Sequence, residues 1–500
     1  MTKNTFKPAV FFVPFLLLLG SAGYSLWDAE GFLAGVTSAN TWILSHFGWL
    51  FSWGTFFFLA LCAGVYFSPL AGVRIGGEEA RPLLTRWQWF SVVLCTTVAI
   101  GILFWGASEP LYHYHAPPQG SSALPASEGA ARFALSTMFM HWTFTPYGIY
   151  TMAGLVFALS YYNHGQSFSL GAMLYPLLGE KAKRWAGLID GLSLYSLVAG
   201  MAASLGAGVL TISGGMERYL DIAGSALLTG GVTLVIVFAF VLSAVSGLSK
   251  GIRWLSGFNT WIFIAFVAYV LLNGSPLRYL VALGAEGVWD YVAHFVPRSL
   301  GIGMDKNWEG SWTVFYWANW LAWAPVSAVF LGRIALGYTV REFIHFNLLL
   351  PALFSALWML VFSGNALYYD TAEGGMFAIL QANGPEHVVY ALFEHLPFPL
   401  LRGVVFFGTA FLSYVSGADA NATAMGGLSA RGISPDNPEP AAWLKVAWGV
   451  LVGFTAWVMV SQAGVDGIKM ASNLGGFPAL LFLLGVGAGL LRLLVGSWKK

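Results

Sequence analysis

Stretches of about 20 mostly apolar residues follow one another along this chain, with short polar breaks between them. A helix of that length spans the hydrocarbon core of a bilayer. Hydrophobic residues make up 57% of the chain and charged residues only 9%, whereas about a quarter of the residues in a soluble domain are charged. The sequence therefore predicts an all-α integral membrane protein that has the lipid bilayer as a partner.

About twelve of these stretches are expected to be transmembrane helices. The expected spans are 9–27, 45–68, 87–112, 131–160, 186–213, 225–248, 252–273, 311–333, 343–365, 400–425, 442–461 and 467–494. An even number of spans places both termini on one side. Most Lys and Arg residues then fall on that side, so the positive-inside rule predicts cytoplasmic termini, in a bacterial-type inner membrane.

The first apolar stretch, 9–27, has a second interpretation. Lys3 and Lys7 precede it and small residues lie near its end, which is also the pattern of a cleaved signal peptide. Its length and the even number of spans favour a retained helix.

Two long connections lie on the expected outer side, at about 274–310 and 366–399. Both contain amphipathic patterns, such as Trp289–Val296, that indicate helices lying at the membrane interface. They are expected to cover an entrance.

Several classes of function lack support in the sequence. Cys62 and Cys95 both lie in apolar stretches, which argues against a disulfide framework or a metal site. His113 and His115 lie close together, but at an expected membrane edge, where an interfacial role is favoured over metal binding. No phosphate-binding loop occurs. We expect no metal, no cofactor, no nucleic-acid partner and no enzymatic activity.

Aromatic residues form stripes on two of the expected spans. The fourth span carries Trp142, Tyr147 and Tyr150, and the eighth carries Tyr316, Trp317, Trp320 and Trp323 at helical spacing. A quaternary ammonium group has no N–H to donate, and aromatic faces recognise it through cation–π attraction. The alternative is that these rings only pack the core or form interfacial belts.

Two acidic residues fall within the expected spans. A buried charge is costly in a membrane and usually has a task. Glu109 precedes Pro110 near the outer end of its span, where it could be merely interfacial, and Asp419 lies deeper in the tenth span. Asp419 could equally be a structural hydrogen-bond acceptor.

The chain resembles the betaine/carnitine/choline transporter family over nearly its whole length. The shared segments are FWGASEP at 104–110, HW at 141–142, SLGAG at 204–208 and WTVFYWANW at 312–320, with Arg333 and Arg341-Glu342-Phe343 beyond. The segment at 312–320 is the most specific of these.

The resemblance implies a fold and a mode of action. Two extra helices (1–86) would precede two inverted five-helix repeats (87–273 and 311–500), joined by the amphipathic periplasmic connection 274–310. The protein would be a homotrimeric secondary transporter that works by alternating access on a small zwitterionic or cationic solute, such as betaine, carnitine or choline. The family's substrate box falls on Trp142, Tyr147, Tyr150 and Trp320, with Trp323 beside the pathway.

Departures from the family pattern affect the substrate site. Family members often have a glycine-rich run that unwinds around the substrate where this chain has Thr96–Gly101, and Val98 in this segment is therefore expected to contact the substrate. Tyr147 replaces one box tryptophan, and Asn319 stands where many relatives have another. These changes keep open a solute without a permanent cation, such as a sulfonate or an amino acid.

Other departures affect the coupling ion. Sodium-driven members have two threonines where this chain has Leu197 and Met201, and neither side chain offers sodium an oxygen. At the second sodium site Ser416 supplies a hydroxyl but Gly417 does not. We therefore expect a sodium-independent carrier.

The driving force is then either substrate exchange or proton symport. Proton symport needs a titratable group, for which Asp419, Glu109 and His141 are the candidates. A membrane-embedded enzyme is a weaker alternative, because the sequence offers no clustered catalytic constellation.

Overall fold

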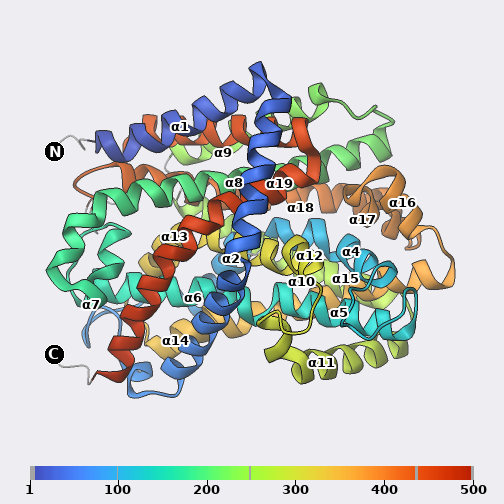
Figure 1. Cartoon of the computed structure of the whole chain (residues 1–500), viewed down its shortest axis with the longest axis horizontal. Helices are drawn as coiled ribbons and strands as arrows, with labels where there is room; N and C mark the ends of the chain where they lie inside the picture. Colours follow the sequence, from blue (N-terminus) through green and yellow to red (C-terminus); the bar gives the residue numbers. More distant parts are fainter. Residues whose placement is uncertain (1–5, 98, 247–248, 434–436, 438, 497–500) are drawn as a thin grey trace.

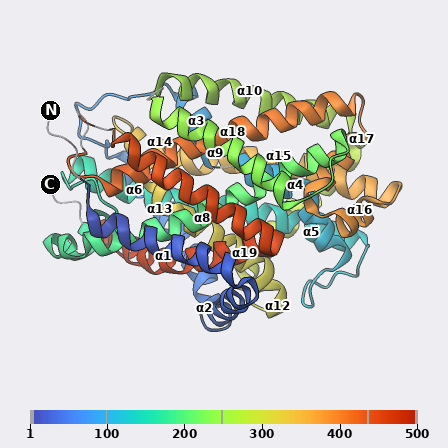
Figure 2. The same ribbon diagram turned by 90° about the horizontal axis from the view of Figure 1, so that it is seen from above.

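The computed structural model describes residues 6–97, 99–246, 249–433, 437 and 439–496. Within these residues the chain is helical, and extended segments pair only at two isolated β-bridges. The start of α1 (Pro8–Trp27) and the end of α19 (Ala442–Val495) lie at one end of the molecule, and α16 (Met376–Asn383) and α17 (Pro385–Glu394) lie at the other (Figures 1 and 2). This placement is the one that an even number of crossings requires.

The other helices fill the space between these two ends. They are α2 (Ala29–Tyr66), α3 (Arg86–Thr97), α4 (Ala99–His115), α5 (Glu128–Trp142), α6 (Phe144–Ala158), α7 (Tyr175–Leu178), α8 (Ala182–Leu220), α9 (Ala226–Ser246), α10 (Ser249–Asn273), α11 (Leu277–Ser299), α12 (Lys306–Glu309), α13 (Phe315–Ile334), α14 (Val340–Ile344), α15 (Leu350–Ala372) and α18 (Pro399–Ser429). Short 3₁₀ and π segments join some of them: η1 (Pro69–Gly72), η2 (Leu159–Asn163), η3 (Gly171–Leu174), η4 (Gly179–Lys181), η5 (Gly310–Val314) and η6 (His345–Leu349).

The expected membrane spans correspond to these helices. In the described residues, 8 helical segments are long and apolar enough to cross a membrane, and the pairs α3–α4 and α10–α11, bent by 56° and 112°, meet the same criteria only when each pair is taken together. α19 counts once in this total, although Gly464 (φ 51°, ψ −129°) breaks it between the expected spans 442–461 and 467–494. The helices α5 and α6 together form the expected span 131–160. Each expected span therefore has a helix or a helix pair.

One boundary was placed too late. The second span was expected from residue 45, but α2 begins at Ala29 and is 38 residues long. Residues 29–44 include Glu30, Asn40 and several hydroxyl side chains, so their hydropathy alone does not mark them as part of a span. The side chain of Asp28 accepts a hydrogen bond from the backbone N–H of Gly31 at 2.9 Å and caps the helix there.

The fourth span is broken near its middle. α5 ends at Trp142 and α6 begins at Phe144, with Thr143 between them in a non-helical conformation (φ −118°, ψ −114°). Pro146 lies in the first turn of α6, where its missing N–H costs no helical hydrogen bond. The break places Trp142 and Tyr147 on separate helices that meet in the interior.

The connection after α10 contains a helix, α11, where the sequence predicts an amphipathic one. α11 turns away from α10 by 112° and so does not continue that span. Its side chains Trp289 and Val292 are exposed. On its opposite face Asp290 and Arg298 form an ion pair, and Arg298 also donates to Ser136 of α5 at 2.8 Å. This polar contact fixes α11 against the bundle.

Close approach of α19 to α13 depends on a glycine. A Cβ atom on Gly476 would lie 2.3 Å from the carbonyl oxygen of Ala318 and 2.6 Å from its Cα. Both are backbone atoms, so a Gly476→Ala variant must push the two helices apart. We expect a loss of about 1–3 kcal/mol, measured as a lower thermal unfolding temperature in detergent. Gly231→Ala on α9 is the control, because nothing lies within 4 Å of its added Cβ; equal shifts in the two variants would contradict the packing argument.

Candidate substrate site

A cavity of about 70 Å³ lies where α3, α4, α5, α6, α8, α13, α18 and α19 meet. Five residues predicted for the substrate site line it: Trp142, Tyr150, Asn319, Trp320 and Trp323. Trp105, Phe315 and Tyr414 are among the other lining residues. The structure therefore brings residues from both aromatic stripes to one internal surface.

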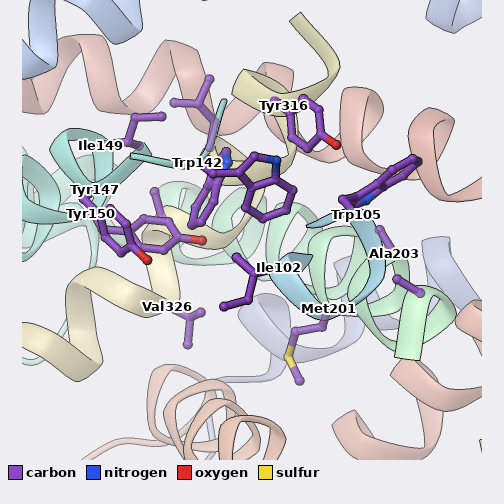
Figure 3. Packing of buried hydrophobic residues seen from close by; sticks show 14 of the residues in the cluster. Ile102, Trp105, Trp142, Tyr147, Ile149, Tyr150, Met201, Ala203, Tyr316 and Val326 are labelled. Carbon is purple, nitrogen blue, oxygen red and sulfur yellow. The ribbon is translucent and has the colours of Figure 1, made fainter. Parts of the chain in front are cut away.

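Trp320 is the centre of the aromatic cluster. Its ring centroid lies 5.7 Å from that of Trp142, 5.8 Å from Tyr147 and 5.2 Å from Tyr150, at interplanar angles of 74°, 54° and 63°. These are edge-to-face and tilted contacts, a favourable arrangement for aromatic pairs. Figure 3 shows Trp142 beside the two tyrosines, with Trp105 and Tyr316 on its other side. The four predicted box residues thus form one contiguous cluster.

Tyr147 is the one member of this cluster that does not line the cavity. Its hydroxyl is 2.9 Å from Oγ of Ser355 on α15, and the residue is fully buried. It supports Trp320 from the protein side of the box.

The indole N–H of Trp320 is an unpaired donor. Its Nε1 atom is buried and has no hydrogen-bond partner among the described residues. Buried polar groups nearly always have a partner, and a buried donor without one costs about 1–3 kcal/mol. Trp320 lines the cavity with other atoms of its side chain, so this donor becomes available to a hydrogen-bond acceptor on a solute when the indole ring shifts.

Glu109 is the polar centre of one wall of the site. Its side chain is fully buried. Oε2 accepts hydrogen bonds from Trp142 Nε1 at 2.9 Å and from the Tyr316 hydroxyl at 2.5 Å. Oε1 lies 2.7 Å from His141 Nδ1 and 3.2 Å from His113 Nε2. The carboxylate therefore fixes the orientation of Trp142, one of the box rings.

The same residues have the composition of a small metal site. Ligand atoms of Glu109, His113 and His141 all lie within 4.8 Å of one another. Both histidine nitrogens, however, lie at hydrogen-bond distance from the same carboxylate oxygen, and Nε2 of His141 is 3.1 Å from Oγ1 of Thr313. A His141 with its proton on Nδ1 satisfies both contacts, and we interpret the group as a hydrogen-bond network.

The other candidate coupling residues, Asp419, Ser416 and Met201, do not line the cavity. Asp419 accepts a hydrogen bond from Ser243 of α9 at 2.6 Å, and the cavity is lined on α18 by its neighbours Gly417 and Ala418. The hydroxyl of Ser416 donates to the carbonyl of Leu412 at 2.8 Å, within its own helix. Met201 and Leu197 are fully buried.

The segment before α4 is described only in part. Val98, which was predicted to contact substrate, lies outside the described residues. The hydroxyls of Thr96 and Thr97 donate to the carbonyls of Val92 and Val93, each at 2.7 Å, and both residues line the cavity. Sequence reasoning did not select Trp105 or Phe315 as site residues, although both fall within the quoted segments FWGASEP and WTVFYWANW.

Nearly the whole chain is similar to known membrane transporters. The family model "BCCT, betaine/carnitine/choline family transporter" matches residues 9–498. A probable glycine betaine transporter of Desulfitobacterium hafniense is 28% identical over 88% of this chain and 88% of its own. An ectoine/hydroxyectoine transporter of Virgibacillus pantothenticus is 27% identical over 100% and 99%. A high-affinity choline transport protein of Escherichia coli is 28% identical over 98% of this chain and 72% of its own.

Proposed function

The chain belongs to the betaine/carnitine/choline transporter family, and we propose that it carries a small quaternary-ammonium or betaine-like zwitterion independently of sodium. Like the other members of this family, it is a multi-pass membrane transporter and not an enzyme. The names of those relatives, which mention glycine betaine, ectoine and choline, support a solute of this class.

One observation carries the choice of a zwitterion. Trp320 offers two complementary features at the cavity: its ring lies in a cluster with Trp142 and Tyr150, and its indole N–H has no partner. Ring faces attract a quaternary ammonium group, and an unpaired N–H attracts a carboxylate. A betaine-like solute carries both groups within a few bonds of each other.

The alternative is a solute without a permanent cation, such as a sulfonate or an amino acid. Asn319, which replaces a tryptophan common among relatives, lines the cavity, and its Oδ1 accepts a hydrogen bond from Ser472 at 3.0 Å. A competition panel in reconstituted vesicles separates the two readings. Inhibition by betaine and choline supports the proposal, whereas inhibition by taurine alone supports the alternative.

Sodium independence rests on the side chains at the expected ion sites. Leu197 and Met201 present no side-chain oxygen at the first site, and Gly417 leaves Ser416 as the single hydroxyl of the two expected at the second. Sodium binds several oxygen ligands, so these positions are poorly equipped for it. Transport would then be driven by substrate exchange or by protons.

Uptake into liposomes tests this directly. We expect the purified protein to take up radiolabelled betaine, carnitine or choline equally in sodium and potassium media, with uptake supported by internal substrate or by a proton gradient. The expected change on replacing sodium is less than about twofold, since no bound ion is lost. Protein-free liposomes are the control. Strict dependence on sodium would contradict the assignment of Leu197 and Met201.

The larger organisation is part of the same proposal. Two helices (1–86), two inverted repeats (87–273 and 311–500) and the connection 274–310 would work by alternating access in a homotrimer. The placement of both described chain ends at one end of the molecule is compatible with cytoplasmic termini (Figure 2).

A further inference from the structure

Lys469 places its ammonium group among three aromatic rings. Nζ lies 4.0 Å from the ring centroid of Trp312, 5.4 Å from Phe315 and 5.8 Å from Trp105. All three distances fall within the range in which a cation is attracted by an aromatic face. Nζ also donates to the backbone carbonyl of Ser311 at 3.3 Å. We call Trp105, Trp312 and Phe315 the outer cage.

The outer cage lies at the boundary between two cavities. Trp105 and Phe315 line the central cavity described above. Phe315, Ser311 and Lys469 also line a second cavity of about 430 Å³, which is bounded by α2, η5, α13 and α19. In the predicted topology this second cavity lies on the outer side. A solute that passed between the cavities would therefore pass the ammonium group of Lys469.

The simpler explanation is an interfacial lysine that reaches for water or for a carboxylate. Lysines near helix ends commonly do so. Among the described residues, however, no carboxylate lies within ion-pair distance of Lys469. Asp466, one turn earlier on α19, is exposed. Asp466 lines the same second cavity and is a nearby counter-charge, but the groups in direct contact with Nζ are ring faces and one carbonyl, which is an environment for an organic cation.

We propose that Lys469 is a built-in cation that occupies the outer cage and competes there with the cationic group of an entering solute. The inference rests on the proposed function in one respect, that the solute is an organic cation. One ammonium group fills the space over the three rings, so a second cation enters only when Lys469 moves out. Gly464, the break in α19, lies five residues before it and provides a joint about which this part of the helix can move. Lys469 thereby lowers the affinity of the outer cage for the solute's cationic group, so that the solute moves on toward Trp320.

Binding of tetramethylammonium to purified protein tests the competition. Lys469→Met keeps a long apolar side chain and removes the charge. We expect tetramethylammonium, followed by tryptophan fluorescence, to bind this variant about tenfold more tightly than wild type, as expected for loss of a competing cation–π contact. Lys469→Arg is the matched control and should bind as wild type does. Equal binding by Lys469→Met and wild type would overturn the proposal.

A second variant locates the gain and separates this proposal from the function itself. Trp312→Leu in the Lys469→Met background should return tetramethylammonium binding to the wild-type value, because Trp312 is the ring nearest to Nζ. If the gain survives, the outer cage is not its source and the proposal fails. Uptake of radiolabelled choline is measured in parallel. If Lys469→Met binds tetramethylammonium more tightly but the wild type takes up neither choline nor betaine, the proposed function is rejected and the cage assignment stands. If the wild type takes up choline or betaine but Lys469→Met binds no more tightly, the proposed function stands and the cage assignment is rejected.

Discussion

A Trp320→Ala variant is expected to lower solute uptake by about thirtyfold. The ring of Trp320 contacts Trp142, Tyr147 and Tyr150, and its N–H is the unpaired donor at the cavity. A desolvated cation–π contact is worth about 2 kcal/mol, and each 1.4 kcal/mol is a tenfold change in affinity. Loss of the contact should raise the KM for betaine more than it lowers kcat. Initial uptake rates over a range of betaine concentrations in proteoliposomes measure both.

The alanine variant also removes a large buried side chain, which costs about 3–5 kcal/mol of stability. Trp320→Phe keeps one aromatic ring but removes the N–H donor and part of the indole ring surface. It should fold normally and discriminate less well between betaine and choline, because choline has no carboxylate to accept the missing bond. Trp448→Phe is the control, since Trp448 is fully buried but packs against Phe11 and Phe15 far along the chain from the box. Unaltered uptake by both Trp320 variants would show that the box is misassigned.

Helical periodicity predicted only part of the shared aromatic surface, because Tyr316 and Trp317 of the same stripe do not line the cavity. Trp320 and Trp323 are three residues apart, and both line the cavity, as does Trp142 from the other stripe. Family resemblance added that the two stripes meet, which periodicity within one helix does not reveal. The role of Tyr147 depended on the break at Thr143, which turns its hydroxyl toward Ser355. A single unbroken helix was expected there, so that orientation was not available from the sequence.

The polar residues were harder to place. Sequence position suggested that Glu109 could lie at the membrane edge, yet its four donors come from α4, α5 and α13 and converge only when these helices pack. Depth in a span did not determine which way Asp419 faces. Successive helical residues are rotated by about 100°, so its neighbours Gly417 and Ala418 line the cavity while Asp419 contacts Ser243 of α9. Rotation about the helix axis is set by tertiary packing.

Replacing Glu109 is expected to have an effect as large as replacing Trp320, for a different reason. Glu109→Ala would leave the indole N–H of Trp142, the hydroxyl of Tyr316 and two histidine nitrogens without their acceptor in a fully buried site. Each unpaired buried donor costs about 1–3 kcal/mol. We expect little folded Glu109→Ala protein, measured as loss of the monodisperse peak in size-exclusion chromatography in detergent.

Glu109→Gln keeps the size of the side chain and removes its charge. One of the two carboxylate oxygens becomes an NH2 group, which cannot accept a hydrogen bond. Either the two histidines, which share Oε1, or Trp142 and Tyr316, which share Oε2, then lose their acceptor. We expect a folded protein with uptake reduced by about tenfold or more, because Trp142 is no longer held in the box.

Asp419→Asn is the matched control for Glu109→Gln, as a second buried carboxylate with a different partner, Ser243. Because Asp419 lies outside the cavity lining, its variant should keep betaine counterflow within about twofold of wild type. Comparing counterflow with proton-driven uptake in the two variants also identifies the coupling group. Glu109→Gln uptake that is normal in both assays would contradict the positioning role of Glu109, and selective loss of proton-driven uptake in Asp419→Asn would assign coupling to Asp419 instead.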